Sequence, residues 1–131
     1  MKVVDLFCGA GGLSIGLEQA GLETVIGVDL DKDAMTTYAS AHPKSDAICD
    51  DVLDVVDGLV PRFKNNRKRT SPLVLVGGPP CQGFCAINPT RHVNDPRNSC
   101  VDMFLHAAAS LEPDFVLMEN VTGLLSLGKP S

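Results

Sequence analysis

The sequence lacks any apolar run of the length that a membrane span requires. No stretch approaches the roughly 20 consecutive apolar residues needed to cross a bilayer, so no membrane attachment is expected. The start of the chain is also unlike a secretory signal, because Asp5 interrupts its first apolar residues. These absences predict a cytoplasmic protein.

Cysteines are few, and their number is odd. Five cysteines do not form the dense framework of a small secreted domain, so free thiols are expected. Three of them lie between Cys81 and Cys100, but one Cys-x3-Cys pair without a second paired motif is weak evidence for zinc, and we expect no metal. The histidines, His42, His92 and His106, have no visible partners and are expected to be surface or helix residues.

An excess of positive charge is also absent. The chain has 11 basic and 16 acidic residues and a net charge of −5, whereas a nucleic-acid-binding surface is usually basic. The one basic cluster covers residues 62–69. A solvated loop is its simplest interpretation, and the alternative, a nucleic-acid contact, rests on charge alone. A nucleic-acid partner would therefore need phosphate contacts from a local patch or from protein outside this chain.

The pattern that is present alternates short apolar runs with helical stretches. It predicts one α/β domain with a doubly wound, mostly parallel sheet. The expected strands cover residues 3–7, 24–28, 47–49, 73–76 and 115–118. The expected helices cover residues 13–20, 32–40, 52–59 and 99–111, with a polar loop over 61–72. Residues 77–98 form a long segment rich in glycine and proline, and a loop of this length is usually functional.

A glycine turn follows the first strand, and an acidic residue ends the second. The turn is Cys8-Gly9-Ala10-Gly11-Gly12, and Asp29 follows Gly9 by about 20 residues, where such folds bind ribose hydroxyls. A nucleoside-containing ligand is therefore expected. The turn differs from the dinucleotide motif, and Asp5 would repel phosphate, so the sulfonium of S-adenosylmethionine suits it better. A tight turn without a ligand is the alternative.

Asp51 and Val52 follow the third strand at the same edge of the sheet. Asp51 could accept a hydrogen bond from an adenine amino group, with Val52 against the ring. Asp51 is also a candidate N-cap of the next helix, and the two roles are compatible.

Cys81 comes after the fourth strand, and Glu119 ends the fifth. Pro79 and Pro80 stiffen the approach to Cys81, which neighbouring groups could activate as a nucleophile. A plain buried thiol is the alternative. Because neighbouring parallel strands end at the same edge, Glu119 is expected near Cys81 as a proton donor.

Three blocks of the chain resemble signature motifs of the DNA cytosine-5 methyltransferases. These blocks are Asp5-Leu6-Phe7-Cys8-Gly9-Ala10-Gly11-Gly12, Gly78-Pro79-Pro80-Cys81-Gln82-Gly83-Phe84 and Glu119-Asn120-Val121. Their order and spacing match the family over nearly the whole chain. The resemblance implies a Rossmann-like fold and methyl transfer from S-adenosylmethionine to carbon 5 of a flipped cytosine in double-stranded DNA, leaving S-adenosylhomocysteine.

The resemblance also implies roles for single residues. Cys81 would attack carbon 6 of the ring, Glu119 would bond ring nitrogen 3, and Asn120 would hold the loop at Pro80 and Cys81. Gln82 belongs to the same catalytic block and is a DNA-binding candidate, and Arg97 is a candidate phosphate contact. The residues assigned to the cofactor are Phe7, Gly9, Gly11, Gly12, Asp29, Leu30, Asp51, Val52, Pro80 and Cys100.

The chain departs from the family pattern in small and large ways. Cys85 replaces a usual serine, and Cys100 replaces an aliphatic residue near the adenine. Relatives of the family that act on tRNA usually change the residues after Cys81-Gln82, so Gly83-Phe84 favours DNA. Family members also continue into a target-recognition domain and further conserved blocks, none of which occurs here.

Residues 1–131 are therefore interpreted as a partial catalytic domain, truncated after the fifth strand, whose last strand exposes an apolar edge. Three hypotheses remain, and the third of them, a cytosine methyltransferase that acts on tRNA, is disfavoured by Gly83-Phe84. The chain is one part of an enzyme that a second chain completes, or it is an inactive cofactor-binding fragment. Restriction–modification is the expected setting if the source is bacterial, with the protein in the cytoplasm or associated with the nucleoid.

Overall fold

A computed structural model describes residues 1–64, 71–80 and 99–121 of the chain. Five strands and four helices alternate along it. The strands are β1 (Lys2–Leu6), β2 (Glu23–Asp29), β3 (Asp46–Cys49), β4 (Leu73–Gly77) and β5 (Phe115–Met118). The helices are α1 (Gly12–Gln19), α2 (Lys32–Ala41), α3 (Val52–Lys64) and α4 (Ser99–Leu111).

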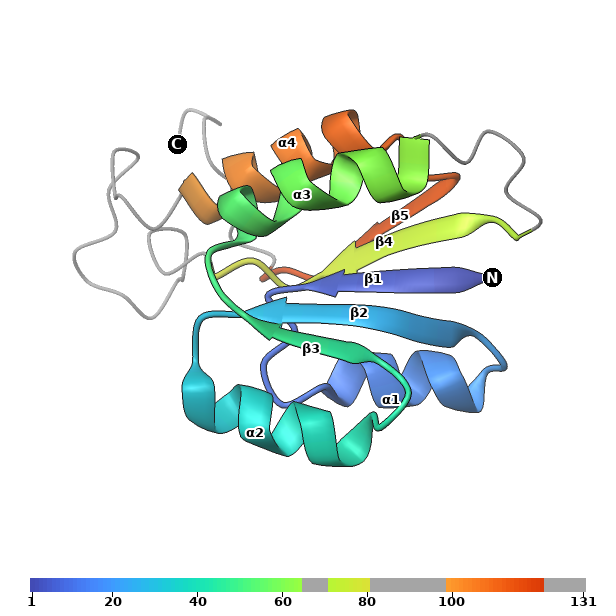
Figure 1. Cartoon of the computed structure of the whole chain (residues 1–131), viewed down its shortest axis with the longest axis vertical. Helices are drawn as coiled ribbons and strands as arrows, with labels where there is room; N and C mark the ends of the chain where they lie inside the picture. Colours follow the sequence, from blue (N-terminus) through green and yellow to red (C-terminus); the bar gives the residue numbers. More distant parts are fainter. Residues whose placement is uncertain (65–70, 81–98, 122–131) are drawn as a thin grey trace, which may run out of the picture.

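The strands form one parallel sheet in the order β3-β2-β1-β4-β5. Helices α1 and α2 cover one face, and α3 and α4 cover the other (Figure 1). This is a doubly wound α/β arrangement, as the alternation of strands and helices predicted. The chain reverses its direction of winding between β1 and β4, and in such sheets ligands bind outside the carboxyl ends of the strands at that point.

Hydrophobic burial on both faces stabilises the central strands. On one face Val4, Leu6 and Leu75 pack against α3 and α4, which contribute Val56 and Phe104 among others. On the other face Val3, Val74 and Val76 pack against apolar residues of α1. Each fully buried side chain of this kind contributes about 1.5–3 kcal/mol, so the sheet is held mainly by its β1 and β4 residues.

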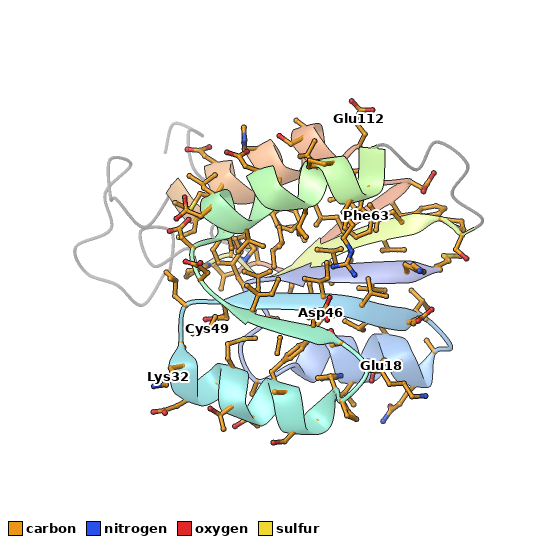
Figure 2. All side chains as sticks on the ribbon, in the orientation of Figure 1. Glu18, Lys32, Asp46, Cys49, Phe63 and Glu112 are labelled. Atoms are coloured by element: carbon orange, nitrogen blue, oxygen red, sulfur yellow. The ribbon has the colours of Figure 1, made fainter. Side chains whose placement is uncertain are left out.

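Helix α3 extends further than the sequence predicted. It continues through Pro61 to Lys64, so the expected loop over residues 61–72 is wrong for its first four residues. Phe63 packs against the core from the side of α3 that faces the sheet (Figure 2), and this contact compensates for the backbone hydrogen bond that Pro61 cannot make. Arg62 pairs with Asp46 over 3.0 Å at an exposed position.

Strand β5 pairs with β4 and forms one edge of the sheet within the described residues. Phe115 is 56% exposed, Val116 51% and Leu117 45%, although the three side chains alternate between the faces of the strand. An apolar strand exposed on both faces is unusual, and it matches the edge expected after the fifth strand. Among the described helices, none is both long and apolar enough to cross a membrane.

Candidate active site

The carboxyl ends of the strands surround a cavity of about 370 Å³. Its lining residues come from the segments that follow β1, β2, β3 and β4 and from the start of α4. They are Phe7, Asp29, Leu30, Asp51, Val52, Gly78, Pro80, Cys100 and Met103. Every residue that the sequence assigned to a cofactor is in this set except the turn glycines, Gly9, Gly11 and Gly12.

Two lining residues, Gly78 and Met103, were missed by sequence reasoning. Gly78 begins the motif that leads to Cys81, so its place in that motif was an available signal. Met103 lies three residues after Cys100 on α4, and residues with this spacing share one face of a helix. Helical periodicity would therefore have added Met103 once Cys100 was assigned.

Asp29 ties the glycine turn to the end of β2. Its Oδ2 accepts a hydrogen bond from the Gly9 amide over 2.8 Å, and its Oδ1 accepts one from the Asp31 amide over 2.9 Å. The carboxylate is therefore fixed by two backbone donors on opposite sides. Each oxygen keeps a further lone pair, so Asp29 can still accept hydrogen bonds from a ligand in the cavity.

The turn itself has unusual backbone geometry. Phe7 has a φ of 57° and Gly11 a φ of 93°, both in the left-handed region. This conformation is available to glycine but costs an ordinary side chain about 1–3 kcal/mol, and such strain concentrates at functional sites. Phe7, with this strained backbone, lines the cavity.

A buried carboxyl group lies close to the turn. Asp5 accepts a hydrogen bond from the Ser14 hydroxyl over 2.6 Å, and its Oδ1 has no partner among the described residues. Its pKa is raised from 3.8 to about 6, mainly by burial and to a smaller extent by the charge of Asp29, against the lowering effects of Ser14 and His42. At neutral pH Asp5 adds negative charge near the turn, which disfavours a phosphate ligand there.

Cys8, the cysteine at the start of the turn, is buried and unsuited to nucleophilic chemistry. Its Sγ lies 3.6 Å from the sulfur of Met35. Burial raises the pKa of the Cys8 thiol well above its usual range, and the charges of Asp5 and Asp29 add to this effect. Cys8, Cys49 and Cys100 are all free thiols, as expected for the described cysteines.

Asp51 caps α3, as one of the two interpretations of the sequence predicted, and it also lines the cavity. Its Oδ1 accepts a hydrogen bond from the Leu53 amide over 2.8 Å, which caps the start of α3. The residue also lines the cavity beside Val52. Burial raises the pKa of the nearby Cys100 thiol, and the charge of Asp51 raises it further. The Cys100 thiol therefore lines the cavity as an uncharged group.

Glu119 and Asn120 lie against the segment that leads to Cys81. The Glu119 amide donates to the Gly77 carbonyl over 2.9 Å, and a Cβ placed on Gly78 would lie 3.3 Å from Glu119 Oε2. The Asn120 Nδ2 donates to the Pro79 carbonyl over 3.2 Å. The predicted residues Cys81, Gln82 and Arg97 lie outside the described residues.

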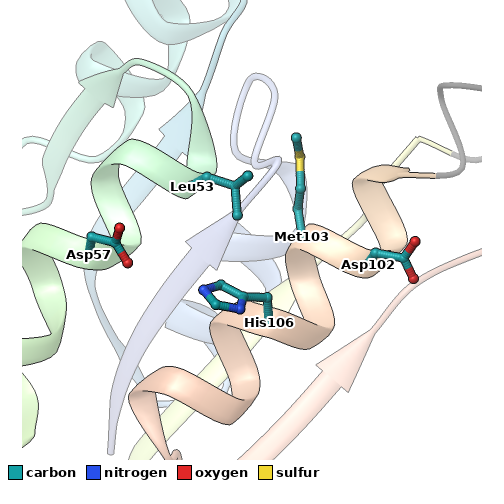
Figure 3. Close-up of a pocket in the computed structure, with 5 residues that line it drawn as sticks. All are labelled: Leu53, Asp57, Asp102, Met103 and His106. Atoms are coloured by element: carbon teal, nitrogen blue, oxygen red, sulfur yellow. The ribbon is translucent and has the colours of Figure 1, made fainter.

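A second cavity of about 440 Å³ lies between α3 and α4. Leu53 and Asp57 line it from α3, and Asp102, Met103 and His106 line it from α4 (Figure 3). Both carboxylates are exposed, and so is His106, as the sequence predicted. Met103 lines both cavities, so its side chain is a wall between them.

The expectation for His42 was wrong. The residue is only 2% exposed, and its ring nitrogens lie within hydrogen-bonding distance of Glu18 and of the Gly11 carbonyl. A signal was available in the sequence, because Met35, Tyr38 and His42 fall at helical spacing on α2. That stripe continues an apolar face onto His42 at the end of the helix, which indicates a buried position.

The chain is similar in sequence to known DNA methyltransferases. The model of the family described as C-5 cytosine-specific DNA methylase matches residues 1–129. The type II methyltransferase M.XorII of Xanthomonas oryzae is 40% identical over 126 residues, which are 96% of this chain and 29% of that protein. M.AgeI of Thalassovita gelatinovora is 39% identical over 128 residues, which are 97% of this chain and 29% of that protein.

A solved structure shows the same fold. It is a prophage-encoded protein of E. coli described as a DNA modification methyltransferase, with 35% sequence identity and a TM-score of 0.76. The match covers 95% of this chain and 33% of the other. The present chain thus spans about a third of the length of each of these three relatives.

Proposed function

Because the chain belongs to the family of C-5 cytosine-specific DNA methylases, we propose that it supplies the cofactor site and the nucleophile for methylation of carbon 5 of cytosine in DNA. The observation that carries the proposal is the cavity at the carboxyl edge of the sheet. It lies between the glycine turn and the segment from Gly78 to Pro80, which enters the Cys81 motif.

The cavity fits S-adenosylmethionine. Its volume falls within the usual range for small-molecule sites, about 300–1,000 Å³. Asp29 and Asp51 offer carboxylate oxygens to ribose hydroxyls and to an adenine amino group, and Phe7 and Leu30 offer apolar surface to the adenine. When bound, S-adenosylmethionine supplies an electrophilic methyl group, and S-adenosylhomocysteine remains.

The chain's own residues would then act on a cytosine that has left the base stack, because its ring is unreachable inside the duplex. The Cys81 thiolate attacks carbon 6, and Glu119 bonds ring nitrogen 3, where negative charge develops. These interactions make carbon 5 nucleophilic. After methylation, the carbon-5 proton passes to solvent, the double bond between carbons 5 and 6 forms again, and the Cys81 thiolate leaves carbon 6. Asn120 supports this chemistry by holding the Pro79 carbonyl in place.

DNA binding would depend largely on protein beyond this chain. The net charge of −5 provides no general attraction for DNA, so Arg97, Gln82 and the cluster at residues 62–69 would be local contacts. The exposed apolar strand β5 provides a place where further strands can add. A segment equivalent to the rest of the relatives' length, on this or another polypeptide, would cover β5 and complete the enzyme.

A second candidate is a cofactor-binding fragment without catalytic activity. Two observations favour this candidate. Strand β5 is exposed, and the chain matches only 29% of the length of M.XorII. Under this hypothesis cofactor binding by residues 1–131 is expected to be about micromolar or weaker, because they match only 29% of M.XorII and the remainder of such a relative would contribute to the pocket. Calorimetric titration of the chain with S-adenosylhomocysteine measures this, and tight binding would contradict the expectation.

Reconstitution tests the main proposal. The chain is mixed with the complementary segment of a relative, DNA and cofactor labelled in its methyl group, and label is expected on cytosine. The Cys81→Ser variant should lose this activity, whereas Cys49→Ser should keep it, because Cys49 is an exposed thiol outside the cavity. Label transferred by the Cys81→Ser variant would mean that the nucleophile is assigned wrongly.

A further inference from the structure

His42 is a buried titratable residue that the proposed chemistry does not use. It follows the end of α2, and its side chain has no exposed surface. Its Nδ1 lies 3.0 Å from Glu18 Oε1, and its Nε2 lies 3.2 Å from the Gly11 carbonyl oxygen. The ring therefore joins the last turn of α1 to the glycine turn beside the cavity.

Both partners of His42 are hydrogen-bond acceptors. A carboxylate oxygen and a carbonyl oxygen carry no proton to donate, and a neutral imidazole carries one N–H group. A neutral ring would leave one nitrogen facing an oxygen without a shared proton, which is costly for a buried group. A ring that carries protons on both nitrogens satisfies both contacts.

The charges around His42 favour a cation. Glu18 of α1 contacts it directly, and Asp5 of β1 is close enough for its titration to respond to the histidine charge. Glu23 and Lys44 share a surface hollow with His42 and Glu18, where their charges offset each other. On its own helix the ring packs against Tyr38, with centroids 4.4 Å apart.

We propose that His42, protonated on both ring nitrogens and paired with Glu18, is a positioning residue that fixes the glycine turn for cofactor binding. The inference rests on the proposed function for the ligand of the turn. Gly11 makes three hydrogen bonds, because its amide donates to the Cys8 carbonyl and its own carbonyl accepts from the Ile15 amide and from His42. A side chain at Gly11 would collide with the His42 ring, so the two residues are fitted to each other.

The position of Gly11 affects the ligand through the short turn. Gly9, two residues earlier, donates to Asp29, which lines the cavity. A shift of the Gly11 carbonyl would therefore move the Gly9 amide away from Asp29 and change the carboxylate that faces the ribose. Glu18 is the residue of this series that lies furthest from the cavity, and it does not contact the ligand itself.

The protonation of His42 is tested directly by nitrogen NMR of the imidazole rings in the full chain. At pH 7 the His42 ring should show protons on both nitrogens, and the signal should be absent from His42→Asn. In Glu18→Gln the ring should carry one proton at pH 8. A single protonated nitrogen in the unsubstituted chain at pH 7 would overturn the proposal, whatever the chain binds.

The positioning role is tested by the pH dependence of S-adenosylhomocysteine binding. Glu18→Gln should bind several-fold, up to about tenfold, more weakly than the unsubstituted chain at pH 8, because a neutral imidazole still donates to the Gly11 carbonyl but more weakly than a charged one. The difference should be smaller at pH 6 than at pH 8, because a more acidic solution favours the doubly protonated ring in both chains. Glu23→Gln, which changes a carboxylate in the same hollow, should bind normally at both values.

Equal binding by Glu18→Gln and the unsubstituted chain at pH 8 would overturn the positioning role. Glu18 is partly exposed, so its variant is expected to fold even if His42→Asn does not. If the unsubstituted chain binds no cofactor, amide hydrogen exchange at Gly11 and Gly12 replaces the titration. Faster exchange in Glu18→Gln then supports the role, and unchanged exchange contradicts it, while the loss of binding counts against the proposed function alone.

Discussion

The Gly9 amide donates a hydrogen bond of 2.8 Å to the Asp29 carboxylate, which joins the turn after β1 to the end of β2. The two residues are 20 positions apart in the sequence, and they meet because β1 and β2 are parallel neighbours whose carboxyl ends share one edge. The bond combines two roles, since the same carboxylate fixes the turn and lines the cavity.

Asp29→Asn should weaken S-adenosylhomocysteine binding at least tenfold and lower the free energy of unfolding by about 1–2 kcal/mol. The Gly9 and Asp31 amides donate to different oxygens of Asp29, and in an asparagine one of these positions is an NH2 group, which cannot accept. Calorimetry and urea denaturation measure the two effects. Asp46→Asn, which breaks an exposed ion pair away from the cavity, should change stability by less than about 0.5 kcal/mol.

Asp5 should make stability fall as the pH rises from about 4 to 6. The folded chain keeps a proton on Asp5 in this window after the unfolded chain has released it, because the folded pKa is about 6 and the ordinary value 3.8. The contribution is fully present below the lower value and is worth about 3 kcal/mol. Asp5→Asn should flatten this dependence when urea denaturation is compared at pH 4 and pH 8.

Ser14→Ala is the matched variant for the same titration. The Ser14 hydroxyl donates to Asp5 and lowers its pKa, so removing the hydroxyl should extend the loss of stability to a higher pH. An unchanged pH profile in both variants would mean that Asp5 is not the group that titrates.

Gly27→Ala should destabilise the chain by about 1–3 kcal/mol, as overpacking in a core does. A Cβ on Gly27 would run into the Tyr38 ring, which is fully buried and has no room to move. Gly16→Ala is the control, because a Cβ there meets nothing within 4 Å and α1 should gain up to about 1 kcal/mol. Thermal denaturation should show a lower melting temperature for Gly27→Ala and an equal or higher one for Gly16→Ala. A higher melting temperature for Gly27→Ala would contradict the close packing.

Leu117→Lys should reduce self-association of the chain and weaken its assembly with the complementary segment. A lysine on an exposed edge strand opposes the addition of another strand. Leu105→Lys on α4 is the control, since Leu105 is exposed to a similar extent and lies away from β5. Light scattering and the reconstituted methyltransferase assay should show a change for Leu117→Lys alone. Equal effects of both variants would indicate a general influence of charge.

Much of the fold could be predicted because local pattern and tertiary structure agree. The apolar run at residues 73–76 is buried on both faces of the sheet, and helix α4 begins and ends where predicted. Pro61 misled the sequence analysis, since local propensity favours a helix end there while burial of Phe63 favours its continuation. The packing of Phe63 against the core decides between the two, and a local sequence pattern contains no information about such tertiary contacts.

The candidate site could be predicted only in part, because some of its residues directly follow strands and others do not. Residues that directly follow a strand, such as Asp29 and Asp51, could be placed because a parallel sheet fixes where its carboxyl ends lie. His42 could not be paired in the same way, because Glu18 lies on another helix and Gly11 in a turn 31 residues earlier. The roles of Cys81, Gln82 and Arg97, which lie outside the described residues, stay predictions.

The central position of β1 has a consequence for synthesis of the chain on the ribosome. Of the five described strands β1 is the first to be translated, and β2 follows soon after, but the other neighbour of β1, β4, ends only at Gly77. At roughly 5–20 residues per second, one side of β1 waits several seconds for that neighbour. During this interval the nascent chain presents Val3 and Val4, which are fully buried in the finished protein, to any chaperone near the exit tunnel.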